Sequence, residues 1–155
     1  MTIVKSPWII RTQQTKRPQT TGAVHVTKFT YDFGLVQSKA LAAGDILELA
    51  ILPANAVLAD AVLVTEGAFA ALTADIGIMS GEVGADLNED GSARTSDNSL
   101  FAGAALATTF ARLAKPDVIL LQRDDDTETS IGVKVSGAVA KAAGKRIHLI
   151  LYYYQ

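Results

Sequence analysis

The sequence contains no cysteine, which excludes disulfide bonds, thiolate metal sites and cysteine nucleophiles. Histidine is scarce too: His25 and His148 stand far apart, so several imidazoles cannot gather around one metal ion within a single chain. We expect His25 in an arm or at a strand edge, and His148 in a sheet. Neither a Gly-x-Ser-x-Gly elbow nor a glycine-rich phosphate-binding pattern occurs. These absences exclude most catalytic constellations, and we predict no cofactor.

Long apolar runs are also missing. The most apolar stretch, residues 40–64, is interrupted by three acidic side chains and is therefore no membrane span. The apolar patches near the N-terminus are short and are broken by Lys5, Pro7 and Arg11, unlike a signal peptide. We therefore expect a soluble, unsecreted protein that binds no membrane.

The charge is unevenly distributed, although the formal net charge of the 155 residues is only -2. Residues 1–31 hold five basic side chains and no acidic one, so the rest of the chain is acidic. Residues 1–22 are rich in Thr, Gln, Lys, Arg and Pro without a period of two or 3.6, which predicts an extended basic arm. Residues 23–155 are long and apolar enough to form one compact body with its own core.

Strand signals recur at short intervals through this body. Lys28–Phe33 alternates polar and aromatic residues, as in a strand with one buried face. Further strands are predicted at Asp45–Leu52, Val57–Thr65, Ala74–Met79, Val118–Gln122, Ile131–Ser136 and Ile147–Tyr154. In the Ala-rich segment Asn98–Leu113 we expect a turn of helix that leads into a strand from Ala107, because the residues after Ala107 are poor helix formers.

About eight strands separated by turn signals indicate an all-β protein rather than alternating strands and helices. Eight strands in two sheets are typical of a jelly roll. We therefore predict a jelly-roll-like antiparallel β-sandwich with an extended N-terminal arm. The last strand, 147–154, is so apolar that it is most easily buried in the middle of a sheet.

The loop Asp86–Asp97 has the spacing of an EF-hand calcium loop, with Asp86, Asn88 and Asp90 at the first, third and fifth places and Gly91 at the sixth. An EF-hand loop lies between two helices, whereas a predicted strand precedes this one. We therefore predict a solvated connection with no metal; Asp86, Asn88 and Asp90 are the residues that a weak calcium site of another kind would use.

A second acidic cluster, Asp124–Glu128, is predicted to be a solvated hairpin. Its carboxylates repel one another and remain in water. The sequence leaves open whether the two acidic loops meet in space and share a cation.

The basic arm carries three large apolar residues, Trp8, Ile9 and Ile10, among the basic residues Lys5, Arg11, Lys16 and Arg17. Large apolar groups in an arm pack either on the body of the same chain or on another chain. The basic side chains could follow a phosphate backbone, but the interleaved Thr and Gln and the apolar triplet favour a protein partner over nucleic acid.

The runs Gly44–Leu58 and Ala74–Gly81 and the pair Leu100-Phe101 resemble the small structural proteins of tailed bacteriophages that decorate or cement the capsid. The resemblance implies a jelly-roll or related β-sandwich body without enzymatic activity, made in the host cytoplasm and carried on the capsid surface. It also implies dimers or trimers that bind at junctions between major capsid proteins and stabilise the shell.

With that role, the arm supplies the contacts to the major capsid protein. The expected anchors are Trp8, Ile9 and Ile10. An acidic shell surface is expected to pair with the basic side chains Lys5, Arg11, Lys16 and Arg17. The alternative is a receptor- or glycan-binding β-sandwich module of a phage tail or fibre, which would present the loop 86–97 to its ligand. A β-sandwich hydrolase would need an acid/base pair among Glu48, Glu66 and Glu128, and nothing nominates one.

Overall fold

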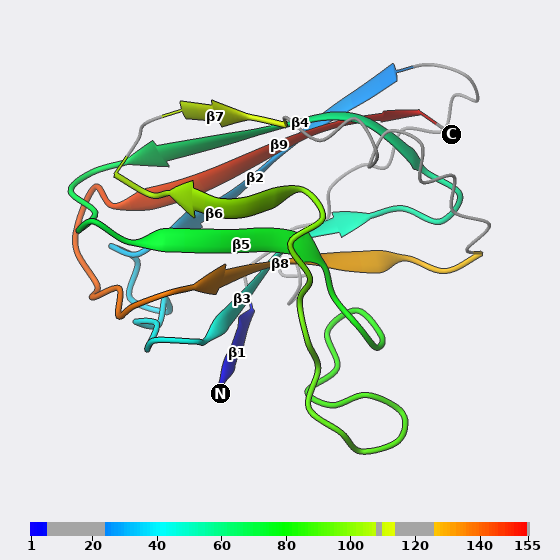
Figure 1. Cartoon of the computed structure of the whole chain (residues 1–155), viewed down its shortest axis with the longest axis horizontal. Coiled ribbons are helices and arrows are strands. Elements are labelled where there is room, and N and C mark those ends of the chain that lie inside the picture. Colours follow the sequence, from blue (N-terminus) through cyan, green and yellow to red (C-terminus); the bar gives the residue numbers. More distant parts are fainter. Residues whose placement is uncertain (6–23, 108–109, 114–125, 155) are drawn as a thin grey trace.

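The computed structural model describes residues 1–5, 24–107, 110–113 and 126–154 of the chain (Figure 1). The described residues form strands and connecting loops and contain no helix. The nine strands are β1 Ile3–Lys5, β2 Val24–Asp32, β3 Ile46–Leu52, β4 Val57–Glu66, β5 Thr73–Ile78, β6 Phe101–Ala105, β7 Phe110–Arg112, β8 Thr129–Val135 and β9 Arg146–Tyr154.

The strands form two sheets that lie one above the other in Figure 1. One sheet has five strands in the order β1-β3-β8-β5-β6, and the other has four in the order β2-β9-β4-β7. Apart from β1, each sheet takes four strands from different parts of the chain, in the arrangement of an eight-stranded jelly roll. The predicted jelly-roll-like sandwich is confirmed, and so is the central position of the last strand, because β9 lies between β2 and β4.

The core lies between the two sheets and follows from side-chain alternation along the strands. In β9, Ile147, Leu149 and Leu151 are fully buried and Tyr153 is nearly so, whereas the intervening residues face outward. Fully burying one such aliphatic side chain contributes about 1.5–3 kcal/mol. The alternating apolar positions of β9 therefore set which face of this strand meets the opposite sheet.

The strand β1 was not predicted and begins inside the segment expected to be an arm. It pairs parallel to β3, with Ile3 opposite Ile46 and Lys5 opposite Glu48. Val4 is 4% exposed and belongs to the core, which explains why these residues join the sheet. The predicted boundary of the arm after residue 22 is not decided by this strand, because residues 6–23 lie outside the described part of the chain.

The predicted turn of helix in Asn98–Leu113 is wrong. Residues 101–105 form β6, which pairs with β5, and 110–112 form β7 within the predicted strand span. The alanine content suggested helix, but Leu100 and Phe101 are buried in the core and hold the segment against the edge of the sheet. The other predicted strands correspond to β2, β3, β4, β5, β8 and β9, except Val118–Gln122, which lies outside the described residues.

The loop between β5 and β6, residues 79–100, extends away from the sandwich and hangs below it in Figure 1. It contains the calcium-like sequence. Within the described residues, no helix is long and apolar enough to cross a membrane.

Candidate functional site

A buried arginine fixes the 79–100 loop to the sandwich. Arg94 and its partner Glu48 in β3 both have side chains with 0% exposure, and Arg94 Nη1 lies 3.0 Å from Glu48 Oε1. Arg94 also donates to Ser80 O at 2.6 Å, to Ala85 O at 2.9 Å and to Ser130 Oγ at 3.2 Å. The guanidinium therefore ties two turns of the loop to two strands of the five-stranded sheet.

Glu48 receives further donors from its surroundings. The backbone N–H of Gly84 donates to Glu48 Oε1 at 3.1 Å, and the hydroxyl of Ser130 donates to the same oxygen. The other oxygen, Oε2, is buried and has no hydrogen-bond partner. Such a network is stable only while both charges are present, since either ion alone would be left unpaired in the interior.

The residues of the calcium-like pattern each serve a different local contact. Asp86 pairs with Lys5 Nζ at 2.7 Å, and Lys5 also donates to Gly84 O at 2.5 Å. Asn88 donates to Ser92 Oγ and Ala93 O, while Asp90 accepts from the backbone and hydroxyl of Ser92 at 2.9 and 2.6 Å. Within residues 1–5, 24–107, 110–113 and 126–154, no three His, Cys, Asp or Glu side chains are placed to hold a metal ion.

Two carboxyl groups of this loop, those of Asp86 and Asp90, are held in their charged form. The hydrogen bond from Lys5 is the main cause that lowers the pKa of Asp86, and the hydrogen bonds from Ser92 lower the pKa of Asp90. These contacts are those of turn-forming residues. They agree with the predicted solvated connection, which was based on the turn preferences of Asp, Asn, Gly and Ser.

Close packing brings the end of the loop back onto β5. Asp97 Oδ1 accepts from the backbone N–H of Ile78 at 2.7 Å and from the backbone and hydroxyl of Ser99. A Cβ on Gly77 would lie 1.8 Å from Asp97 Oδ1. Only glycine therefore fits at position 77 as long as the loop keeps this backbone path.

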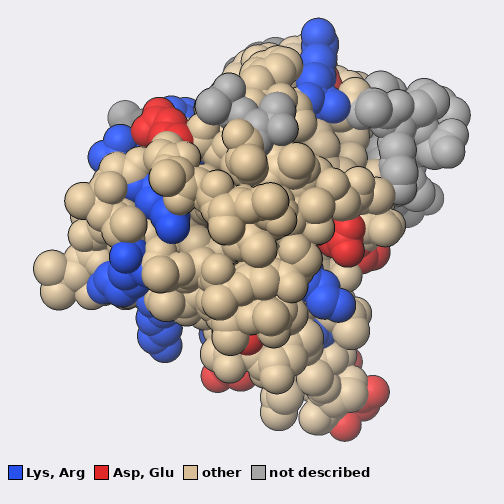
Figure 2. Space-filling model, turned by 60° about the vertical axis from the view of Figure 1, so that its left-hand side comes forward, with Lys and Arg blue, Asp and Glu red and all other residues tan. Residues whose placement is uncertain are grey.

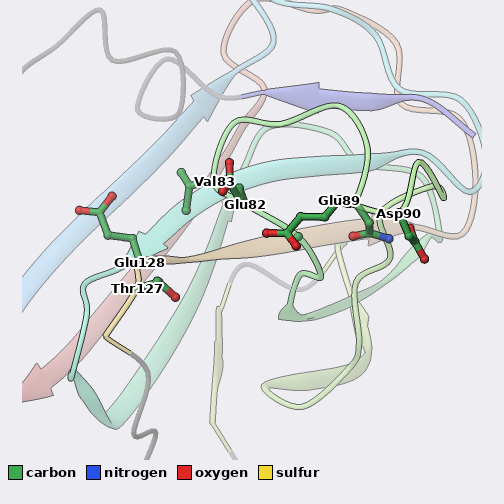
Figure 3. A pocket seen from close by; sticks show the side chains of 8 residues that line it. Glu82, Val83, Glu89, Asp90, Thr127 and Glu128 are labelled. Atoms are coloured by element: carbon green, nitrogen blue, oxygen red, sulfur yellow. The ribbon is translucent and has the colours of Figure 1, made fainter.

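The two acidic loops meet in space. An open cavity of about 710 Å³ is lined by Glu82, Glu89 and Asp90 from the first loop and by Glu128 and Thr127 from the second. Figure 3 shows Glu128 on one side of the cavity and Glu89 and Asp90 on the other. Figure 2 shows acidic groups gathered at the lower end of the molecule, at the height of the 79–100 loop. Among the described residues, four carboxylates and no basic side chain line the cavity, so these side chains together repel anions.

A second ionic group lies on the outer face of the four-stranded sheet. Arg146 bridges Asp32 at 2.7 Å and Glu66 at 3.1 Å. Hydrogen bonds from Arg146 are the main cause that lowers the pKa of both Asp32 and Glu66. On the same face, Arg112 pairs with Asp60 at 2.5 Å.

His148 lies in β9, as the prediction of a sheet position required, and its side chain belongs to the outer face because its neighbours Ile147 and Leu149 face the core. Its Nδ1 lies 2.9 Å from Thr30 Oγ1, and its Nε2 lies 3.2 Å from a Glu66 oxygen without the geometry of a hydrogen bond. Burial lowers the pKa of His148, and Glu66 opposes this shift. Thr30, His148 and Glu66 therefore stand in one row across β2, β9 and β4, and the backbone of β9 between them pairs with both neighbouring strands.

The predicted partner-binding residues fall mostly outside the described residues: Trp8, Ile9, Ile10, Arg11, Lys16 and Arg17. Lys5 is described and is engaged with Asp86 of the same chain. Sequence reasoning missed the pairing of Glu48 with Arg94. Two signals were available: Glu48 interrupts an apolar strand, and Arg94 is the one basic residue among the acids of residues 82–98.

No protein-family model matches the sequence, and no curated protein matches it. Among solved structures, the chain is similar to one from the capsid of Ralstonia phage GP4, with 35% identity and a TM-score of 0.80; the alignment covers 99% of this chain and 97% of that one. A chain from the acidic stable capsid structure of Helicobacter pylori bacteriophage KHP30 shares the fold, with 15% identity, a TM-score of 0.53 and coverage of 88% and 90%.

The first of these similarities decides the family, because it combines substantial identity with nearly complete coverage of both chains. The resemblance of the sequence to phage structural proteins is therefore confirmed as a resemblance to phage capsid proteins. This chain belongs to the family of bacteriophage capsid proteins that is represented in the capsid of Ralstonia phage GP4.

Proposed function

We propose that this protein is a non-enzymatic decoration protein that binds the outside of a phage capsid at junctions between major capsid proteins and stabilises the shell. The observation that carries the proposal is the similarity, at 35% identity over nearly the whole chain, to a chain from a phage capsid. The compact jelly roll suits this role, because a body that spans a junction must resist deformation when the shell is under load.

The division of the chain supports the same role. Residues 6–22 carry the basic side chains Arg11, Lys16 and Arg17 and the apolar triplet 8–10, whereas the described body is acidic. We propose that the triplet anchors the protein in a pocket on the major capsid protein, since large apolar groups dominate interface energy. The basic side chains then pair with acidic groups around that pocket and speed association. Lys5 is not included, because its ammonium group is bound to Asp86.

The decisive experiment adds purified protein to particles that lack it and measures bound copies and particle stability. A triple variant, Trp8→Ala with Ile9→Ser and Ile10→Ser, tests the anchor. Deletion of residues 2–22 is a poorer test, since it also removes β1, whose Val4 lies in the core. We expect wild-type protein to bind and to raise the temperature at which particles release their DNA, and the triple variant to lose at least about tenfold in affinity.

A matched control is Val36→Ser, which changes an apolar side chain that is 94% exposed on the body. This control is expected to bind like wild type. Binding of the triple variant at wild-type affinity would remove the proposed anchor. A copy number of only a few per particle, measured by quantitative mass spectrometry, would contradict decoration and favour the receptor- or glycan-binding alternative.

A further inference from the structure

The residues that lead into the arm are fixed to the body. The backbone N–H of Thr2 donates to Asp45 Oδ1 at 2.8 Å, and Thr2 O accepts from the backbone N–H of Ile46 at 3.1 Å. Val4 is buried in the core, and β1 pairs with β3 along its whole length. The backbone ahead of the arm therefore has a defined position relative to the five-stranded sheet.

Lys5, the last residue of β1, is bound by the 79–100 loop. Its Nζ donates to Gly84 O at 2.5 Å and to Asp86 Oδ1 at 2.7 Å. The backbone N–H of Gly84 donates to Glu48 Oε1, so the same turn of the loop contacts both Lys5 and the buried ion pair. Figure 1 shows β1 and this loop on the same lower side of the sandwich. The arm therefore leaves the body beside the 79–100 loop.

The apolar triplet 8–10 begins three residues after Lys5 and cannot lie far from it. A chain spans at most about 3.6 Å per residue, so Trp8 lies within about 11 Å of Lys5 and Ile10 within about 18 Å, measured between Cα atoms. A domain of about 130 residues has a radius of gyration of about 14 Å and is therefore about 36 Å across. The triplet cannot reach the far side of the body, so a partner that binds it lies against the side that carries β1 and the 79–100 loop.

The loop presents side chains to a partner in this position. Leu87 is 52% exposed, and Glu82, Glu89 and Asp90 are exposed at the cavity. A protein that approaches this side meets an apolar side chain among carboxylates, which basic groups complement and acidic groups repel. The part of the partner beside the loop should therefore be basic, in contrast to the acidic part that suits the basic arm.

We propose that Lys5 is the positioning residue of the arm, and that the major capsid protein that binds the triplet 8–10 also contacts the 79–100 loop through basic side chains. The inference rests on the proposed function, since it takes the triplet as the anchor. A short connection between two contacts makes the second contact intramolecular, at a high effective concentration. The bonds from Lys5 to the loop keep this connection short, because they hold the end of β1 in place.

Lengthening the connection tests the inference. Insertion of eight Gly and Ser residues between Lys5 and Ser6 leaves β1 intact and adds a flexible span of about 16 Å. The affinity for particles that lack the protein is expected to fall at least about tenfold, because the two contacts are then only loosely joined. The same insertion between Gln19 and Thr20, where the connection to β2 is already long, is the matched control and is expected to bind like wild type.

Removal of the Lys5 contact gives an independent measurement. Lys5→Met and Asp86→Asn are each expected to lower the affinity about three- to tenfold. The melting temperature should hardly change, because exposed ion pairs contribute little to stability. Lys5→Arg keeps the charge and the donors and is expected to bind like wild type. In the variant with the insertion after Lys5, Lys5→Met is expected to have no further effect, which a purely structural role would not explain.

Cross-linking locates the partner. The chain has no cysteine, so Leu87→Cys and Val36→Cys each present a single thiol. Val36 O accepts from Lys141 of the β8–β9 connection, which places Val36 at the other end of β8 from the cavity. A short reagent that joins a thiol to an amine is expected to link particle-bound Leu87→Cys to a lysine of the shell, and to link Val36→Cys much less.

The outcomes separate this inference from the proposed function. Wild-type affinity of the variant with the insertion after Lys5, or equal cross-linking of Leu87→Cys and Val36→Cys to the shell, overturns the inference. If the triple variant at positions 8–10 loses binding while that insertion has no effect, the anchor stands and only the placement of the partner is wrong. If the triple variant binds like wild type, the anchor and the placement are both wrong.

Discussion

Breaking the ion pair between Arg94 and Glu48 is expected to be the most damaging single change in the described body. Arg94→Met removes the guanidinium and leaves the Glu48 carboxylate, whose side chain has 0% exposure, without its charged partner. Removing one partner of a buried pair costs about 3–5 kcal/mol, because the remaining charge stays buried and uncompensated. Glu48→Leu leaves the arginine in the same position and is expected to cost a similar amount.

The double variant separates charge from packing. Glu48→Leu with Arg94→Met leaves no buried ion, and replacing a buried pair by apolar residues of similar size is often neutral or stabilising. Here the carbonyls of Ser80 and Ala85 also lose the donors that Arg94 provides. We therefore expect a net loss of about 1–3 kcal/mol, the cost of buried acceptors left without partners, and hence a cost well below the sum of the two single variants.

Urea denaturation at neutral pH measures these differences, and hydrogen exchange shows where they act. A loss of 3–5 kcal/mol corresponds to a fall of roughly 10 °C in the melting temperature of a chain of this size. Exchange is expected to rise first in the 79–100 loop, since Arg94 ties its turns to β3 and β8. The control Lys134→Met removes an exposed basic side chain from β8 and should change stability by less than about 0.5 kcal/mol. If the single variants cost less than about 1 kcal/mol, or if their costs simply add, the reasoning is refuted.

Three further predictions concern individual positions. Gly77→Ala places a Cβ against Asp97 Oδ1 and should destabilise the protein by about 1–3 kcal/mol in urea titrations, because the loop must shift. The pKa of His148 is lowered from 6.5 in the folded state, so its contribution to stability is complete above pH 6.5 and is lost as the pH falls below that value; in His148→Asn the stability should depend less on pH between 7 and 5. Millimolar calcium should leave the melting temperature unchanged, since Asp86 Oδ1 and Asp90 Oδ1 of the calcium-like pattern are occupied by protein donors; a concentration-dependent rise in calorimetry would contradict this.

Much of the fold could be predicted because strand alternation is a local signal. The pattern in Ile131–Ser136 and Ile147–Tyr154 requires only the residues themselves, and β8 and β9 appear where it predicts them. The short strand β1 could not be recognised, since three residues carry no period and its pairing depends on β3, more than forty residues away. The edge strand β6 was missed because its alanines favour helix locally, whereas burial of Phe101 decides the outcome.

The candidate site was predictable only in its parts. Each acidic loop was visible as a cluster, but their approach at one cavity results from the sheet order, which places the start of β8 beside the 79–100 loop. The pairing of Arg94 with Glu48 joins residues 46 positions apart. The ion pairs of the outer face could be found only by knowing which strands are neighbours, because Asp32, Asp60, Arg112 and Arg146 come from four separate strands.

The central position of β9 also has a consequence for biosynthesis. Until residues 146–154 have left the ribosome, β2 and β4 have no common neighbour, and each exposes an unpaired strand edge. The closing contacts join Val24 to Tyr154 across almost the entire chain, a topology that folds slowly because a long loop must close first. A copy that lacks residues 146–154 therefore cannot form the four-stranded sheet in this strand order, so the sheet is completed late in synthesis.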